Sequence, residues 1–424
     1  MSAPPALRRP VFIYGQNHVG GAEYFFLRRA ECAARLGLRP VIVTVPGPMD
    51  ARYRKVAQLI HVDARILSHH AFTPAMAGRV ADEIVDLIGQ GPFHIEATAI
   101  IDTYFAWLLA ARTPGSDYSL LIIRPATSLQ GGWPSWEDMV KRPWRCFEYL
   151  LGEKDNGVLA KLASSGRVLS VNRPCADDAA KIAGLGHLEA VMAPVILPEP
   201  IAVTPSAATD RYLLSVSRLD GTMKVYVLGL IDAFAVLRRE HSDLRLIIVG
   251  DGLGMPSAKN RCLQAGVANS VDFLGTLSPA ELAPIYAGAS VFVGMGTAAC
   301  EAAMYGAPVV LAVAYRPEGV SPGYFGAPGV EGFGEDVPSQ PALPFLGQIN
   351  PLLKDASLAA SVSRSGQEKS LRDHHPEAAA ARMRALLSRP AQPPVPHPWP
   401  MPRWSRFFTN LLASFVRKSI VREA

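Results

Sequence analysis

The sequence has few cysteines, and none of them stand close together. There are five, an odd number at wide spacings, without a C-x-x-C pair. This pattern predicts neither a zinc site nor a framework of disulfide bonds. It favours a reducing compartment such as the cytoplasm.

Long apolar runs are also missing. No stretch reaches the roughly 18 apolar residues that a membrane-spanning helix needs. The longest candidate, residues 225–237, is shorter and contains Asp232. The start of the chain carries Arg8 and Arg9 but no apolar core before a cleavage site, so we expect no signal peptide.

Strong charge of one sign is absent as well. The net charge is +5 over 424 residues, which argues against a protein that binds nucleic acid over its whole surface. An apolar fraction of 49% excludes a mainly disordered chain. The basic excess lies in residues 403–424, which hold five basic residues and one acidic residue.

The first half of the chain alternates short apolar runs with helical segments. Strands are predicted at 10–14 and 40–45, with a glycine-rich turn and a helix at 23–35 between them. This order is typical of a β-α-β unit with parallel strands. Further strands are predicted at 93–100, 119–123, 167–171 and 190–196, with helices such as 104–111 and 136–151.

A proline-rich stretch, residues 197–206, predicts a linker to a second alternating array. The strands predicted in that array are 212–216, 244–249, 271–275, 291–293 and 309–313. The helices predicted between them are 227–240, 259–265, 279–287 and 298–305. Such an array indicates a doubly wound parallel sheet. We expect an ordered loop at 318–347 and a last helical region at 356–387.

The end of the chain differs from both arrays. Seven of the 13 residues from 390 to 402 are proline, which predicts an extended spacer. Residues 403–422 then place aromatic and leucine side chains on one helical face and basic ones on the other. Such a helix suits an anionic membrane surface. The alternative is a helix that packs on the protein itself or on a partner chain.

Two strand-to-helix loops carry residues that suit phosphate groups. Gly20 and Gly21 follow the first strand, where paired glycines let the backbone approach a ligand at a helix N-terminus. Arg218 and Lys224 follow the first strand of the second array, and together they suit a diphosphate. The alternatives are an ordinary tight turn and two solvated charges.

A third motif follows the predicted strand at 291–293. The turn from Gly294 to Gly296 is rich in glycine, and Thr297 is expected to cap the next helix. Glu301 stands one turn into that helix, where it can face the crevice and accept hydrogen bonds from vicinal hydroxyls such as those of a ribose. The alternative is an acid that balances the helix dipole.

In this order along the chain, the motifs resemble those of glycosyltransferase family 4. The segments that carry the resemblance are 20–23 (GGAE), 215–224, 244–252 (LRLIIVGDG), 271–275 and 301–310. The resemblance spans residues 10–388 and is tightest over 211–315. It implies the GT-B fold, an α/β fold in which two Rossmann-like domains with doubly wound parallel sheets face each other across a cleft.

The resemblance also implies roles for single residues. Arg218 and Lys224, the predicted catalytic residues, correspond to the pair that binds the donor diphosphate and stabilises the leaving nucleotide. Glu301 corresponds to the carboxylate that holds the donor ribose. The other predicted donor-binding residues are Gly20, Gly21, Gly250, Phe273, Leu274, Gly296, Thr297 and Ala298. The family retains the anomeric configuration and uses no metal ion, so the resemblance implies neither a metal nor a cofactor here.

One position departs from the family pattern. The family carries E-x7-E, two glutamates eight positions apart, of which the first contacts the donor sugar. Glu301 matches the second glutamate, but Val293 stands at the position of the first. Replacements that the sequence offers, each with an ordinary structural role as the alternative, are Glu331, Glu335, Asp336, Asn17 and His18.

The sequence therefore predicts an acceptor-side domain at 1–200, a donor domain at 201–388, and a spacer with a basic amphipathic helix at 389–424. We expect a cytoplasmic, metal-independent hexosyltransferase at the inner face of the cell membrane. It would move a sugar from a nucleotide-diphosphate sugar to a saccharide or lipid-linked saccharide acceptor in exopolysaccharide, capsule or lipopolysaccharide biosynthesis. An anionic membrane is an expected partner, and nucleic acid is not.

Three alternatives stay open. A degenerate GT-B module would bind a nucleotide sugar or a partner enzyme without turnover, and the missing first glutamate favours it. A nucleotide-sugar epimerase would use the same fold, but it needs acid and base residues that the sequence does not place. A membrane-docking assembly protein would act through residues 403–422.

Overall fold

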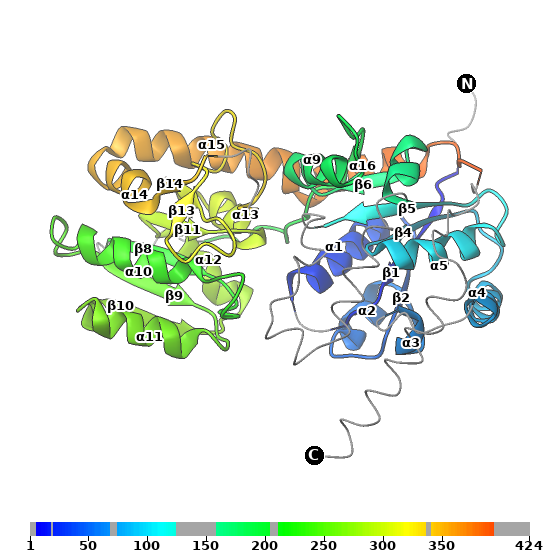
Figure 1. The fold of residues 1–424 in the computed structure, drawn as a ribbon, viewed down its shortest axis with the longest axis horizontal. Helices are drawn as coiled ribbons and strands as arrows, with labels where there is room; N and C mark the ends of the chain where they lie inside the picture. Colours follow the sequence, from blue (N-terminus) through cyan, green and yellow to red (C-terminus); the bar gives the residue numbers. More distant parts are fainter. Residues whose placement is uncertain are drawn as a thin grey trace, which may run out of the picture. The chain divides into compact units, whose positions relative to one another are not determined.

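The computed structural model describes residues 6–17, 20–67, 74–123, 158–203, 211–335 and 341–393. Its contacts divide the chain into two units (Figure 1). Unit 1 comprises Met1–Pro194 and Ala379–Ala424, and unit 2 comprises Val195–Ala378. The predicted helix at 136–151 and the predicted membrane-binding segment at 403–422 lie outside the described residues.

Unit 1 contains a parallel sheet, which has seven strands among the described residues, in the order β3-β2-β1-β4-β5-β6-β7. The strands are β1 Arg9–Tyr14, β2 Val41–Thr44, β3 Gln58–His61, β4 Phe93–Ala97, β5 Asp117–Ile122, β6 Val168–Ser170 and β7 Val191–Met192. The residues of β2, β4, β5 and β6 are buried throughout, and so are those of β1 after Arg9. Such continuous burial is typical of a parallel sheet that is covered on both faces.

Helices connect these strands. They are α1 Gly21–Arg35, α2 Asp50–Val56, α3 Ala64–Leu67, α4 Pro74–Ile88, α5 Ile100–Ala110 and α9 Arg173–Ile182. Single residues next to two of these helices determine where the helices begin or end. The Asn172 side chain caps α9 by accepting from the Cys175 N–H at 2.9 Å. Gly37, with φ of +76°, follows the end of α1 and adopts the left-handed conformation common after a helix C-terminus.

The last described helix, α16 Pro376–Leu387, returns the chain to unit 1. Arg8 donates hydrogen bonds to the carbonyls of Leu386 at 3.0 Å and Leu387 at 3.3 Å. Arg167 donates to the carbonyls of Gln392 and Pro393. These contacts tie described residues between Leu386 and Pro393 to unit 1, whereas the donor domain predicted from the sequence extends to residue 388.

Unit 2 is built on a second parallel sheet. Among the described residues it has five strands in the order β10-β9-β8-β11-β12, and β13 and β14 form a separate antiparallel pair. The strands are β8 Tyr212–Val216, β9 Arg245–Val249, β10 Val271–Gly275, β11 Val291–Gly294, β12 Val309–Leu311, β13 Val320–Ser321 and β14 Leu343–Pro344. The helices are α10 Tyr226–Leu237, α11 Met255–Gln264, η1 Ala268–Ser270, α12 Pro279–Ala287, α13 Thr297–Met304, α14 Phe345–Lys354 and α15 Ala356–His374.

The sheet of unit 2 separates two apolar cores. Leu213, Val291 and Val293 pack in one core with residues of α10, α11 and α14. Leu214 and Phe292 pack in the other core with residues of α12 and α13. Because side chains alternate along a strand, both faces of this sheet are buried under helices, as a doubly wound fold requires.

Several predicted segments differ in the structure. The predicted strand at 190–196 is reduced to Val191–Met192, and the predicted helix at 259–265 begins earlier, at Met255. The predicted strand at 93–100 ends at Ala97, because α5 begins at Ile100 and buries the apolar run that follows. The predicted loop at 318–347 contains β13, β14 and the start of α14. The predicted helical region at 356–387 divides into α15 and α16 at Pro376, whose ring cannot continue the hydrogen bonding of the first helix. None of the described helices is long and apolar enough to cross a membrane.

Candidate functional site

The topology of unit 2 indicates where a ligand would bind. The strand order reverses at β8, because β9 and β10 lie on one side of it and β11 and β12 on the other. In open parallel sheets ligands bind at such a switch point, beyond the carboxyl ends of the strands. Arg218 and Lys224 lie in the loop after β8, and Gly296 lies in the turn after β11. The structure therefore brings these predicted residues to one edge of the sheet.

Asp220 organises the loop between β8 and α10. Its Oδ1 accepts hydrogen bonds from the backbone N–H of Thr222 at 2.9 Å and of Lys224 at 3.1 Å. An aspartate makes this kind of bond to its own turn when it stabilises a loop. The bonds fix the backbone at Lys224, two residues before α10 begins.

Gly250 supports that loop from the neighbouring strand. Its φ is +122°, and a Cβ there would lie 1.9 Å from the carbonyl oxygen of Ser217. The Leu219 N–H donates to the Asp251 carbonyl at 2.9 Å, and the Gly254 N–H donates to the Leu219 carbonyl at 2.8 Å. The loop after β9 thus packs directly on the loop after β8, which only glycine at position 250 permits.

Lys224 and Arg218 provide the positive charge of the site. The pKa of Lys224 is lowered to about 8, chiefly because burial disfavours its charged form; Asp220 and Glu335 oppose this, and Arg218 adds to it. Arg218 is exposed. Within the described part of the chain, no carboxylate lies within 4.0 Å of either cation. Two neighbouring cations without a carboxylate partner suit a ligand with several anionic oxygens.

The turn after β11 begins helix α13. Gly296 has φ of +69°, which favours glycine, and its N–H donates to the Phe333 carbonyl at 2.7 Å. The prediction that Thr297 caps this helix is wrong: Gly296 occupies the N-cap position, and no side chain caps the helix. Thr297 and Ala298 form the first turn, where backbone N–H groups lack intrahelical partners and favour anions.

A tyrosine of helix α12 contacts the carboxylate of Glu301. The Tyr286 hydroxyl donates to Glu301 Oε2 at 3.3 Å, and the Tyr286 ring stacks on Tyr305 with centroids 5.9 Å apart. Burial raises the pKa of Tyr286 well above its usual value, and the Glu301 charge adds to that shift. Glu301 is therefore a half-buried, positioned carboxylate, and its role toward a ribose stays a prediction.

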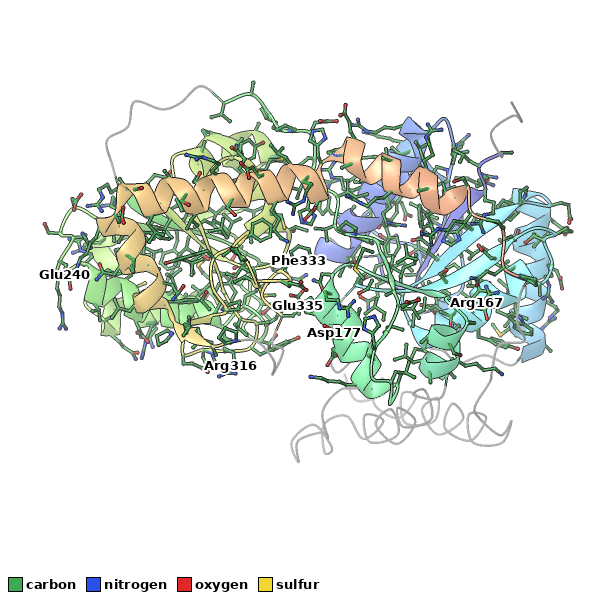
Figure 2. The ribbon with its side chains drawn as sticks, turned by 90° about the horizontal axis from the view of Figure 1, so that it is seen from above. Arg167, Asp177, Glu240, Arg316, Phe333 and Glu335 are labelled. Atoms are coloured by element: carbon green, nitrogen blue, oxygen red, sulfur yellow. The ribbon has the colours of Figure 1, made fainter. Side chains whose placement is uncertain are left out.

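The loop 331–335 lies far along the sequence from the turn after β11 but is hydrogen-bonded to it. Besides the bond from Gly296, the Ala314 N–H donates to the Gly334 carbonyl at 2.9 Å. The Phe333 N–H donates to Glu335 Oε2 at 2.6 Å (Figure 2). Position 334 requires glycine, because φ is +97° and a Cβ would lie 2.0 Å from the carbonyl of Ala312. These contacts place Glu335 at the site, whereas the sequence offered it as one of several acids.

Tyr315, in the loop after β12, is a feature that the sequence analysis missed. Its φ is +63°, which is uncommon for a residue other than glycine, and its side chain is 48% exposed. Its N–H donates to the Met223 carbonyl at 3.0 Å, next to Lys224. Residues in unfavourable backbone conformations gather at binding sites, but tyrosine itself carries no sequence signal for this conformation.

Phe273 and Leu274 lie on β10, the strand beside β9. The Lys259 ammonium lies 5.7 Å from the centroid of the Phe273 ring, and Leu274 is 42% exposed. The Gly250 N–H donates to the Gly275 carbonyl at 2.7 Å, which joins this strand end to the loop after β9. The two side chains are available beside the site, and their contact with a nucleobase stays a prediction.

In unit 1 the equivalent switch point lies between β1 and β4. Gly20 is the N-cap of α1 in an extended conformation, and a Cβ on Gly21 would touch nothing within 4 Å. Asn17 has a structural role: its amide donates to the Val45 carbonyl at 2.8 Å and to Asp50 Oδ1 at 2.7 Å. The other sequence candidates His18 and Asp336 lie outside the described residues.

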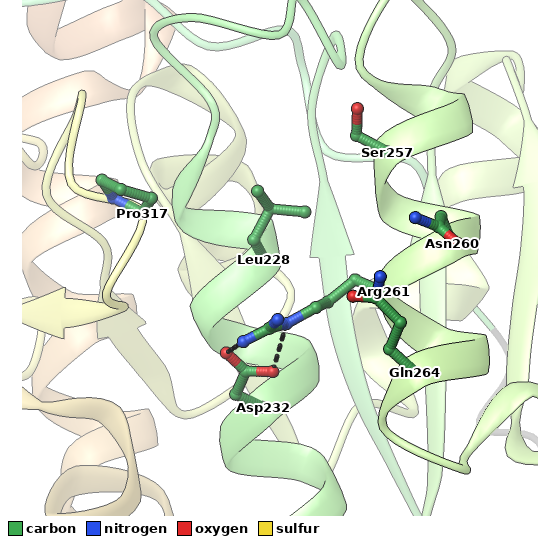
Figure 3. A pocket seen from close by; sticks show the side chains of 7 residues that line it. All are labelled: Leu228, Asp232, Ser257, Asn260, Arg261, Gln264 and Pro317. Atoms are coloured by element: carbon green, nitrogen blue, oxygen red, sulfur yellow. Dashed lines mark hydrogen bonds and ion pairs between the residues drawn. The ribbon is translucent and has the colours of Figure 1, made fainter.

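The described residues also allow a metal site and a separate hollow in unit 2 to be assessed. They contain no group of three or more His, Cys, Asp or Glu residues that could hold a metal ion. A hollow of about 340 Å³ between α10 and α11 has an arginine in its wall (Figure 3). That arginine, Arg261, already binds Asp232 through two hydrogen bonds of 2.6 Å. Its charge is therefore not available in the way that those of Arg218 and Lys224 are.

Solved structures match the chain over most of its length. A glycosyltransferase from Rickettsia africae is 13% identical, with a TM-score of 0.62 over 90% of this chain and 98% of that one. HepE from Anabaena, solved with UDP and glucose, is 16% identical, with a TM-score of 0.59 over 90% and 99%. The lipopolysaccharide outer core galactosyltransferase WaaB is 13% identical, with a TM-score of 0.55 over 88% and 97%.

This chain has a GT-B fold. The likeness to these structures confirms the prediction of an α/β protein with two Rossmann-like domains. Residues 199–340 also match the family model of glycosyl transferases group 1, which supports the sequence resemblance over unit 2. No curated protein matches the chain in sequence.

Proposed function

We propose that this protein is a metal-independent, retaining hexosyltransferase of family 4 that uses a nucleotide-diphosphate sugar. The GT-B fold and the match of residues 199–340 support a glycosyltransferase. The observation that carries the proposal is the pair Arg218 and Lys224 at the switch point of unit 2, without a carboxylate partner among the described residues.

The proposed reaction places negative charge where this pair lies. The acceptor hydroxyl attacks the anomeric carbon on the face from which the nucleotide leaves. The bond from that carbon to the diphosphate oxygen breaks, and its electrons stay on the diphosphate, which takes up the hydroxyl proton. Arg218 and Lys224 stabilise this charge, with the N–H groups of the first turn of α13 beside them.

The acceptor and the location belong to the same proposal. We assign a saccharide or lipid-linked saccharide acceptor, in exopolysaccharide, capsule or lipopolysaccharide assembly, at the inner face of the cell membrane. The basic amphipathic pattern of residues 403–422 supports an anionic membrane as partner. The likeness to WaaB is consistent with such a pathway.

The first test measures sugar transfer and nucleotide release from a panel of nucleotide sugars, with and without EDTA. We expect one donor class to be used equally in both conditions, with the anomeric configuration retained by NMR. Arg218→Ala should lower kcat/KM about 100-fold, because removing a charge contact in a transition state costs about 2.7 kcal/mol or more. Arg239→Ala, which removes an exposed arginine at the end of α10, is the matched control.

A second experiment tests the membrane part. A chain that ends at Pro393 keeps every described contact of unit 1. We expect it to transfer sugar to a short soluble acceptor but to lose sedimentation with vesicles that contain anionic lipid. Loss of transfer to the soluble acceptor would instead place residues 394–424 in the reaction.

A degenerate nucleotide-sugar-binding module is the second candidate. Val293, at the position of the first family glutamate, is fully buried in β11 and cannot contact a sugar. A protein of this kind would bind the donor, yet release no nucleotide with any acceptor. That outcome would replace the transferase proposal while leaving the donor site intact.

A further inference from the structure

Tyr315, in the loop after β12, has a backbone conformation that only glycine adopts elsewhere in the described part of the chain. Its φ is +63°, and every other described residue with a positive φ is a glycine. A tyrosine is strained in this conformation, because its Cβ crowds a neighbouring carbonyl oxygen, whereas glycine has no Cβ. The tyrosine at position 315 therefore costs stability that a glycine would not.

Backbone contacts within unit 2 hold Tyr315 in this conformation. Its N–H donates to the Met223 carbonyl at 3.0 Å, and the Ala314 N–H donates to the Gly334 carbonyl at 2.9 Å. A strained conformation persists where the surrounding structure fixes it in this way. Because Met223 precedes Lys224, the same bond places the backbone of Tyr315 against the loop that carries Lys224.

Packing inside the protein does not account for the Tyr315 side chain. It is 48% exposed, so it adds little to the apolar cores of unit 2. Among the residues that the structure describes, its hydroxyl makes no hydrogen bond, and its ring contacts no other aromatic ring and no cation. A side chain that costs stability and packs little is typical of a binding site.

The order of the strands indicates which part of a donor lies toward Tyr315. The strand before it, β12, is at one edge of the described sheet, and β10, which carries Phe273, is at the other. Arg218 and Lys224 follow β8, the central strand. A nucleotide-diphosphate sugar carries its base at one end of the diphosphate and its sugar at the other. With the base at Phe273, which stays a prediction, the sugar lies toward Tyr315.

We infer that Tyr315 is a specificity-determining residue whose ring packs on the sugar of the donor. A sugar ring presents C–H groups on its faces and hydroxyl groups at its rim. A tyrosine ring covers such a face, and its hydroxyl hydrogen-bonds to the rim. The inference rests on the proposed function, since it assumes that Arg218 and Lys224 hold the diphosphate of a nucleotide sugar.

The experiment separates the ring of Tyr315 from its backbone strain. Tyr315→Gly and Tyr315→Asn remove the ring and suit a left-handed backbone, whereas Tyr315→Phe keeps both the ring and the strain. For the full-length proteins, Tm without ligand is measured by scanning calorimetry, and affinities for UDP, GDP and ADP by titration calorimetry. The diphosphate that binds best is then compared with its hexose conjugate. Leu263→Ala, which removes an exposed apolar side chain of α11, is the control.

The two kinds of variant should differ in both measurements. In Tyr315→Gly and Tyr315→Asn we expect a Tm at least as high as in wild type, because the strain is relieved. Diphosphate affinity should stay unchanged, and the hexose conjugate should bind about tenfold more weakly. Tyr315→Phe should keep the wild-type Tm and lose about threefold or less in conjugate affinity, the share of the hydroxyl. Leu263→Ala should bind both ligands as wild type does.

Other results would overturn the inference in distinguishable ways. If no diphosphate binds the wild type, the proposed function fails and the inference fails with it. If diphosphates bind but Tyr315→Gly and Tyr315→Asn keep full affinity for the hexose conjugate, the inference alone fails. If both variants weaken the free diphosphate as much as the conjugate, Tyr315 supports the Lys224 loop or the nucleotide and not the sugar. A lower Tm in both variants would show that the side chain serves the fold, which would also contradict the inference.

Discussion

The buried charges of unit 1 differ from the two cations at the switch point of unit 2 in whether they have a partner of opposite charge. Unit 1 buries Arg29 against Glu96, and it buries Asp117 between Arg8 and His94. Each of these side chains is 10% exposed or less and has a partner of opposite charge or a hydrogen bond. In unit 2, Arg218 and Lys224 have no carboxylate partner within 4.0 Å among the residues that the structure describes. The buried charges of unit 1 are structural, because each has a partner. The two cations at the switch point of unit 2 are instead placed where a ligand binds in this kind of sheet.

The largest effect should come from breaking a pair in unit 1. Arg29→Ala removes the guanidinium that pairs with the buried Glu96 carboxylate and leaves only His94, whose Nε2 lies 3.6 Å from Glu96 Oε1, so we expect the free energy of unfolding to fall by about 3 kcal/mol. Urea denaturation followed by circular dichroism measures this loss. Replacing both members, Arg29→Met with Glu96→Leu, should cost much less than the single change, because no buried charge is left. Equal costs for the single and double variants would contradict the pairing argument.

A smaller effect concerns pH and Asp117. Burial alone would raise the pKa of Asp117, but the hydrogen bonds and charges of His94 and Arg8 outweigh it and lower the pKa to about 2. The folded state therefore binds fewer protons than the unfolded chain between about pH 4 and pH 2. Stability is present above pH 4, and about 2 kcal/mol of it should disappear as the pH falls through this range. In Asp117→Asn this part of the pH dependence should be absent.

Lys224 should show the opposite dependence. Its pKa is lowered to about 8 by burial, so the folded state has lost a proton between pH 8 and about 10.5 that the unfolded chain retains. Wild-type stability should rise relative to Lys224→Met across this range. We expect about 1 kcal/mol, because the side chain is only half-buried and water screens its charge. A flat difference between the two proteins would show that Lys224 is not desolvated.

The smallest effect belongs to an exposed pair. Asp232 and Arg261 bind each other on the surface of unit 2, in the hollow between α10 and α11. Asp232→Asn should leave Tm unchanged within error in differential scanning calorimetry, because exposed ion pairs contribute little. A clear drop in Tm would show that even an exposed ion pair contributes to the stability of this protein, which would contradict the comparison.

Unit 2 could be predicted from the sequence more closely than unit 1. The strands 212–216 and 271–275 and the helix 279–287 agree to the residue. Strong local signals explain this, such as Ser278, which caps α12 and precedes a proline. In unit 1 the strand β3 was not predicted, because four residues of mixed burial carry too little pattern. Helix α14 was missed in unit 2, because it follows Pro344 and contains Pro351.

The residues of the candidate site also differ in how well the sequence predicts them. Arg218, Lys224 and Gly296 could be located from the sequence, because each follows directly from a strand end. Glu335 and Tyr315 could not, because backbone bonds between distant loops bring them there. Local pattern therefore predicts the cations of the site, and long-range packing decides which acid and which aromatic side chain accompany them.

The central claim is tested most directly by ligand-induced thermal stabilisation in wild type, Lys224→Ala and the control Lys354→Ala, with a panel of nucleotide sugars. Lys354 is an exposed lysine of unit 2 that binds Glu240. A ligand at a hundredfold excess over its dissociation constant adds about 2.7 kcal/mol. We predict that one nucleotide class raises Tm in wild type and Lys354→Ala but not in Lys224→Ala. Equal stabilisation of all three proteins, or none with any nucleotide sugar, would contradict the account.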